Sequence, residues 1–260
     1  MTMGEVRIER EQEIAVLTLD NPPMNVLSLD MSRQILEAVQ ELEHDRSVVA
    51  VVLTGAGDRA FMAGADIKEF TGFIADKKAG SAAEAFDETM QRLHHLSKPT
   101  VAALNGWTLG GGCELALACD FRIAEEQIML GFPEVKLGLF PGAGGTQRLP
   151  RLIGESRAKQ LILTGEPIPA AEAERIGLVN RVVPKGQALA EAKQFAAIFR
   201  ERSQVSIGLA KRAIDEGLDV TLDEGLKMEA RLFGEVFEAE DVAEGVQAFL
   251  EKRAPKFQHR

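Results

Sequence analysis

The sequence predicts an α/β fold, with parallel strands covered by helices and a helical carboxyl-terminal region. Three observations lead to this prediction. The strand-like runs are apolar almost throughout, which is typical of strands buried on both faces of a parallel sheet. Strands and helices alternate over the earlier part of the chain. From about Gly186 onward, apolar residues keep a helical spacing with no strand between them.

The amino-terminal part begins with a buried strand and an amphipathic helix. The strand is the apolar run at residues 14–19, which stops at Asn21-Pro22-Pro23. Ser28 can cap the helix that follows. Apolar residues at spacings of three and four give this helix one buried stripe, formed by Leu29, Ile35, Leu36, Val39 and Leu42.

The middle of the chain continues the alternation. Buried strands are expected at residues 48–54 and 100–104, because each run is apolar and glycine follows it directly or after one residue. The glycines at 110–112 open a helix that runs to about Cys119, and short strands follow at residues 121–124 and 128–130. About three helices then form the carboxyl-terminal region, whose apolar stripes must cover their own core or a neighbouring subunit.

Composition and charge exclude several classes of protein. The chain has 260 residues, of which 45% are apolar and 27% charged, as in an ordinary globular protein of one large domain or one domain with an appendage. The formal net charge of −10 argues against nucleic acid or an anionic membrane as partner. We expect no signal peptide and no membrane span, and therefore a cytoplasmic protein.

The cysteines and histidines predict neither a metal site nor a catalytic triad. Cys113 and Cys119 are six residues apart in one predicted helix and nearly opposite in azimuth, which excludes a disulfide and a metal pair. His44 lies on a solvated helix face, and His259 lies near the terminus. The glycines at 55–57 partly match the dinucleotide fingerprint, but no helix begins in that loop, so we reject a nucleotide site there.

The most informative glycines are at 110–112, directly before Cys113 and Glu114. Glycines at a helix start let an outside group approach backbone N–H donors, which the helix dipole also makes favourable for an anion. Glu114 lies on the same side of the first turn as Gly111, in an apolar setting that would raise its pKa and suit it for proton transfer. The alternative is a first-turn glutamate that only complements the helix dipole.

Two further segments can contribute to such a site. Glu134 follows Pro133 between apolar residues; the alternative to a catalytic role is the first turn of a short helix with proline at its first position. Two carboxylates in apolar surroundings can titrate apart, one as acid and one as base. Asp66 and Glu69 have the spacing of a capping box, and the backbone N–H of Ala65 is a second anion donor if it meets that of Gly111.

Several motifs in order resemble one family. They are Ala63-Gly64-Ala65-Asp66-Ile67-Lys68, Asn105-Gly106, Gly110-Gly111-Gly112-Cys113-Glu114-Leu115, Pro133-Glu134 and Phe140-Pro141-Gly142-Ala143-Gly144-Gly145-Thr146-Gln147-Arg148-Leu149. The chain resembles the crotonase family over nearly its whole length, specifically the enoyl-CoA hydratases. The resemblance implies a spiral of ββα units carrying the acyl-CoA site at residues 1–200. It also implies a helical trimerisation region at residues 201–260 and a trimer or a dimer of trimers.

The resemblance also implies a mechanism. The N–H groups of Ala65 and Gly111 form an oxyanion hole for the thioester oxygen, and the substrate-binding residues are Ala65, Asp66, Ile67, Lys68 and Gly111. Glu114 acts chiefly as base, and Glu134 delivers the proton to the α-carbon. No metal is implied, and no cofactor beyond the coenzyme A that is part of the substrate.

Other functions stay open at the level of sequence. The enzyme alternatives are a double-bond isomerase and a hydratase for a branched thioester of the methylglutaconyl-CoA type. A non-enzymatic RNA-binding relative would be expected to carry a lysine-rich helix, and the net charge of −10 argues against it. Residues 70–81, where the family shapes its acyl pocket, leave the chain-length preference undetermined.

Overall fold

The structure, a computed structural model, describes residues 4–77 and 79–259, so residue 78 of the segment 70–81 lies outside it. The described strands form two sheets, one of six strands in the order β1-β2-β3-β5-β7-β10 and one of four in the order β4-β6-β8-β9. The strands are β1 Glu5–Glu11, β2 Ile14–Asp20, β3 Ala50–Gly55, β4 Ala60–Ala63, β5 Thr100–Leu104, β6 Trp107–Leu109, β7 Phe121–Glu125, β8 Met129–Gly131, β9 Ile168–Pro169 and β10 Arg181–Val183.

Helices follow the strand pairs in a repeating order. The helices are α1 Leu29–His44, α2 Ile67–Asp76, α3 Ala79–His94, α4 Gly111–Ala118, η1 Pro133–Leu137, α5 Gly145–Ile153, α6 Glu155–Thr164, α7 Ala170–Arg175, α8 Ala188–Ala196, η2 Ala197–Glu201, α9 Gln204–Gly217, α10 Leu222–Val236 and α11 Glu240–Glu251. The pairs β3–β4, β5–β6 and β7–β8 each place one strand in the large sheet and one in the small sheet before a helix follows. This repetition is a spiral of ββα units, and it confirms the predicted fold.

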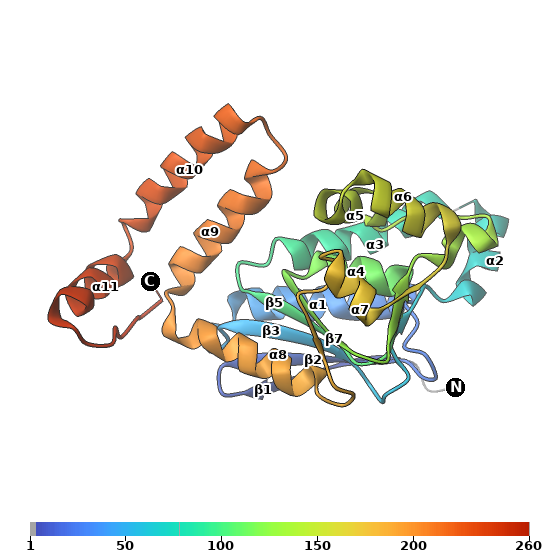
Figure 1. The fold of residues 1–260 in the computed structure, drawn as a ribbon, viewed down its shortest axis with the longest axis horizontal. Coiled ribbons are helices and arrows are strands. Elements are labelled where there is room, and N and C mark those ends of the chain that lie inside the picture. Colours follow the sequence, from blue (N-terminus) through green and yellow to red (C-terminus); the bar gives the residue numbers. More distant parts are fainter. Residues whose placement is uncertain (1–3, 78, 260) are drawn as a thin grey trace.

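The large sheet is parallel except for β1, which pairs antiparallel with β2. Because side chains alternate across a strand, Val16 and Val52 pack toward α8 while Leu17 and Leu53 pack into the larger core on the other face. In Figure 1, α8 lies on one side of this sheet and α1 and α3 on the other. Burial on both faces explains why these strands are apolar throughout.

The predicted elements of the amino-terminal part are confirmed, apart from one strand that was missed. The Ser28 hydroxyl accepts a hydrogen bond from the Met31 amide at 3.1 Å and caps α1 as expected. The strand predicted at residues 48–54 begins at Ala50. The charged residues Glu5–Glu11 form β1, which was missed because this strand lies at the sheet edge and is largely exposed.

The carboxyl-terminal helices α9, α10 and α11 extend away from the sheets in Figure 1, as one arm of the molecule. The chain from about Gly186 onward is helical beyond the core strands, as predicted, but it holds α8 and η2 in addition to these three helices. Large apolar side chains stay exposed on this arm, at Ile214, Leu218, Leu222, Leu226, Phe233, Phe237, Phe249 and Leu250. No helix among residues 4–77 and 79–259 combines the length and the apolar character that a membrane crossing needs.

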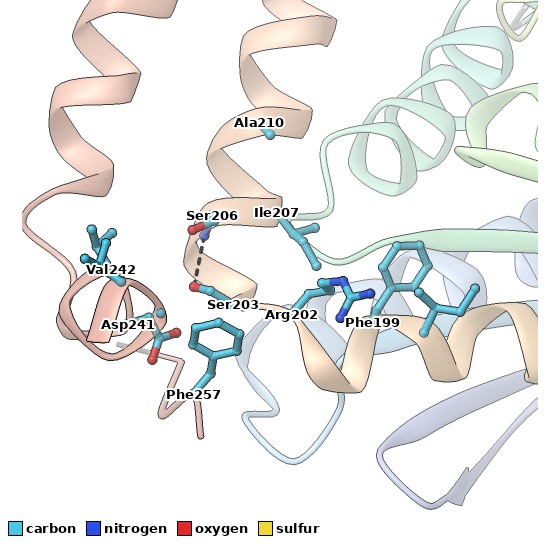
Figure 2. A pocket seen from close by; sticks show the side chains of 12 residues that line it. Phe199, Arg202, Ser203, Ser206, Ile207, Ala210, Asp241, Val242 and Phe257 are labelled. Atoms are coloured by element: carbon cyan, nitrogen blue, oxygen red, sulfur yellow. Dashed lines mark hydrogen bonds between the residues drawn. The ribbon is translucent and has the colours of Figure 1, made fainter. Parts of the chain in front are cut away.

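The end of the chain folds back onto α11. The Asp241 carboxylate, which is 2% exposed, accepts hydrogen bonds from the Gln258 amide at 2.6 Å and the His259 amide at 3.1 Å. Phe257 packs 3.4 Å from the position that a Cβ would take at Gly245. Asp241, Gly245 and Phe257 line a hollow of about 520 Å³ between the chain end and α9. Figure 2 shows Phe257 and Asp241 on the side of α11, and Ser203 and Ile207 on the side of α9.

Candidate active site

Two loops meet at the carboxyl ends of β4 and β6. The strands are parallel neighbours, and Ala63 pairs with Leu109 at their ends. The chain continues from β4 into Gly64 and Ala65, and from β6 into Gly110 and α4. A Cβ placed on Gly111 would lie 3.7 Å from the backbone nitrogen of Ala65. The structure therefore brings together the two backbone amides that were predicted to bind an anion.

Both amides are free to bind an outside acceptor. Leu27 accepts from the Asp66 amide and donates to the Gly64 carbonyl, each at 2.8 Å, so the Ala65 N–H between them points away from Leu27. Gly111 is the first residue of α4, where an N–H has no partner within the helix. Within the described part of the chain, neither N–H has an acceptor. The pair, at a helix N-terminus, is suited to an anionic oxygen.

Glycines allow the close approach that this geometry requires. Gly110 has a φ of +51°, and a Cβ there would lie 2.7 Å from Oε1 of Glu134. A Cβ on Gly112 would lie 2.0 Å from the carbonyl oxygen of Met62, so α4 packs directly on the backbone of β4. Neither position accommodates a larger residue without movement of the backbone or of Glu134.

Glu114 is buried in the first turn of α4, with 3% of its surface exposed. Its Oε1 accepts hydrogen bonds from the amides of Ala143 at 2.7 Å and Gly145 at 2.8 Å. Burial raises the pKa of this carboxyl, while the two amides and the nearby charge of Arg148 act in the opposite direction. The glutamate thus has more partners than a residue that only complements a helix dipole.

Glu134 lies in the first turn of η1, after Pro133, and its carboxylate lies against Gly110. Its Oε2 is buried and has no hydrogen-bond partner in the described residues. Burial, together with the negative charge of Glu114, raises the pKa of Glu134 to about 7. The charge of Glu114 reaches Glu134, so the structure places the two glutamates in one site, a proximity that the sequence could not predict.

The residues after Ala65 lie beside the amide pair. Asp66 caps α2 by accepting from the Lys68 amide at 3.1 Å, as predicted. The predicted capping box is wrong, because the Glu69 carboxylate accepts from the Leu29 amide of α1 at 3.0 Å instead. Ile67, 56% exposed, and Lys68 begin α2 at the surface, and their contact with a ligand stays a prediction.

Sequence reasoning missed the turn that holds Glu114. The amides of Ala143 and Gly145, which donate to Glu114, lie in a glycine-rich segment far from Glu114 in sequence. Buried glutamates need hydrogen-bond donors, and a segment with Gly142, Gly144 and Gly145 offers backbone N–H groups that no side chain covers.

A second hollow, of about 830 Å³, lies behind this turn between α3, α5 and α9, and Arg148 is among its lining residues.

Comparisons with known proteins agree with this geometry. The sequence pattern of the family described as enoyl-CoA hydratase/isomerase matches residues 9–260. The chain is 44% identical to the crotonyl-CoA hydratase of Syntrophomonas wolfei over 261 residues, 99% of each protein. It is 43% identical to the short-chain-enoyl-CoA hydratase of Clostridium acetobutylicum over 256 residues, 97% of each. The crystal structure of an enoyl-CoA hydratase from Bacillus anthracis superposes with a TM-score of 0.94 at 40% identity, covering 98% of this chain and 100% of that one.

Proposed function

The chain belongs to the enoyl-CoA hydratase/isomerase family, and we propose that it adds water across the 2,3 double bond of 2-enoyl-CoA thioesters to give 3-hydroxyacyl-CoA. It is an enzyme of the hydro-lyase class. The observation that carries the mechanism is the buried, unpartnered Oε2 of Glu134, which lies in one site with Glu114 and close to two free backbone amides.

The amides of Ala65 and Gly111 bind the thioester oxygen. Attack of water at the β-carbon moves negative charge onto that oxygen, and fixed N–H donors stabilise the charge as it develops. One such donor contributes about 3–4 kcal/mol to transition-state stabilisation in other enzymes. The N-terminus of α4 adds the favourable end of the helix dipole.

Glu114 and Glu134 divide the proton transfers. Glu114 takes a proton from the attacking water, whose oxygen forms a bond to the β-carbon. Glu134 gives its proton to the α-carbon, where the electron pair of the double bond ends. A pKa of about 7 suits Glu134 to this role, because a large fraction of the carboxyl carries a proton at neutral pH. Exchange with solvent then restores both groups.

The remaining expectations extend this proposal. Coenzyme A runs along Ala65, Asp66, Ile67 and Lys68, and no other cofactor and no metal takes part. The exposed apolar side chains of α9, α10 and α11 support assembly with further copies of the chain, as a trimer or a dimer of trimers. The enzyme is expected in the cytoplasm, in fatty-acid or related acyl-CoA breakdown.

The test is the ultraviolet absorbance of crotonyl-CoA mixed with the purified protein, because hydration removes the conjugated double bond. We expect rapid bleaching with 3-hydroxybutyryl-CoA as product. Glu114→Gln and Glu134→Gln should each lower kcat by roughly 100-fold or more. Glu155→Gln is the control, since Glu155 is an exposed residue of α6. Turnover of 3-enoyl-CoA alone, or of a branched methylglutaconyl thioester alone, would instead support an isomerase or a specialised hydratase.

A further inference from the structure

Arg148 lies in α5 and contacts the Ala143–Gly145 turn. Its Nη1 donates to the carbonyl oxygen of Ala143 at 3.3 Å. A Cβ on Gly144 would lie 1.9 Å from Nη1 and 3.1 Å from Cζ of the same guanidinium. The guanidinium therefore occupies the space that a Cβ at residue 144 would take, so a larger residue there would displace it.

The peptides held by this contact are the ones that bind Glu114. The amides of Ala143 and Gly145 flank Gly144, and both donate to Oε1 of Glu114. Gly144 has a φ of +103°, a left-handed conformation that orients the two amides toward one acceptor. We infer that Arg148 is a positioning residue for Glu114: its guanidinium holds the Ala143–Gly145 turn and brings a positive charge to the site. This inference rests on the proposed role of Glu114 as base.

The charges around the site support this role. Burial raises the pKa of Glu114, and Arg148 is the cation that opposes this effect, whereas the negative charge of Asp87 of α3 raises it further. Glu134 of η1 adds a second negative charge only in its ionised form. His94 of α3 also faces Arg148, and burial lowers the pKa of His94 to about 4, so the imidazole is neutral at the pH of the reaction. Loss of Arg148 would remove the cation that offsets the burial of Glu114 and leave the two amides to hold it.

The shape of the Arg148 side chain acts on the Ala143–Gly145 turn, and its charge acts on Glu114. Its planar guanidinium fits flat against Gly144 and donates to Ala143. Its charge acts on Glu114 through space, because no direct ion pair joins the two among the described residues. Arg148→Lys keeps the charge and loses the planar contact, while Arg148→Met keeps much of the length and loses both. The two variants thus separate charge from shape.

The experiment compares crotonyl-CoA hydration by Arg148→Met, Arg148→Lys and the control Arg151→Met over a range of pH. Arg151 is in the same helix, has a side chain that is 57% exposed and pairs with Asp219 rather than with the turn. We expect Arg148→Met to lower kcat by roughly 10-fold to 100-fold with little change in KM, because substrate binding uses other groups. The acidic limb of the kcat–pH profile of Arg148→Met should move up by about one pH unit, because loss of the cation favours the protonated carboxyl of Glu114.

In Arg148→Lys, the acidic limb of the kcat–pH profile should lie at the wild-type pH, while kcat should recover only in part. Arg151→Met should behave like the wild type. An acidic limb that stays in place in Arg148→Met, or equal loss in the lysine and methionine variants, would overturn the inference and leave Arg148 a structural residue. If the wild type fails to hydrate any enoyl thioester, the proposed function fails by itself. The inference on Arg148 is then tested by infrared titration of the Glu114 carboxyl, assigned with Glu114→Gln. A titration midpoint that is the same in Arg148→Met and in the wild type would overturn it.

Discussion

Replacing Glu134 by glutamine should abolish most activity. It should also raise the free energy of unfolding, by an amount that depends on pH. The carboxyl has an ordinary pKa of 4.5 when unfolded and about 7 in the folded protein. The folded state therefore binds more protons between these values, and the free energy of unfolding of the wild type falls as pH rises through this window. Glutamine has no proton to lose, so the variant lacks this decline.

The magnitude follows from the difference in pKa. At about 1.4 kcal/mol per pKa unit, a difference of about 2.5 units corresponds to about 3.5 kcal/mol. Glu134 is only half-buried, and solvent screening reduces this to roughly 1–2 kcal/mol. Most of this gain in the free energy of unfolding of Glu134→Gln over the wild type should develop between pH 5 and pH 8. A gain of this size raises Tm by on the order of 5 °C for a chain of this length.

The assay is urea unfolding of the wild type and Glu134→Gln at pH 5 and pH 8, at one protein concentration because assembly shifts apparent stability. Glu155→Gln, at an exposed carboxylate, should show no such gain at pH 8. The same preparations should show the loss of kcat for crotonyl-CoA. A Glu134→Gln protein that is less stable than the wild type at pH 8, or a stability difference that is equal at both pH values, would refute the reasoning.

Two further predictions concern packing and assembly. Gly112→Ala should unfold the protein or leave it insoluble, because its Cβ would lie 2.0 Å from the carbonyl oxygen of Met62. The control is Gly142→Ala, whose Cβ would lie 4.0 Å from the nearest atom. In a thermal scan of both variants, this control should unfold like the wild type. Phe233→Glu places a charge on the exposed apolar face of α10 and should shift sedimentation velocity toward smaller species with little change in helix content; an unchanged sedimentation coefficient would contradict assembly through that face.

Much of the fold could be predicted because burial leaves a pattern in the sequence. The strands β2 and β5 were found as continuous apolar runs, and α1 by its stripe and its Ser28 cap. The strand β1 was missed because it lies at an exposed edge and has mixed charges. The capping box failed because Glu69 bonds to α1, a contact between elements far apart in sequence. Local patterns do not encode such pairings.

The candidate site was predictable in its parts and not in its assembly. Glycines before Glu114 indicated free N–H groups, and Pro133 before Glu134 indicated the short helix η1. That Ala65 meets Gly111 depends on the pairing of β4 with β6, which joins residues more than forty positions apart. The turn at Ala143–Gly145 depends on the approach of α5 to α4. Only the folded chain shows these contacts.

The central claim is that Glu114 and Glu134 act together on one bound thioester. The most direct measurement is kcat/KM for crotonyl-CoA in the wild type, Glu114→Gln, Glu134→Gln and the double variant. We predict that each single variant loses roughly 100-fold or more and that the double variant loses much less than the product of the two, as for residues that act as a unit. Wild-type rates in either single variant, or losses that multiply fully in the double variant, would contradict the account.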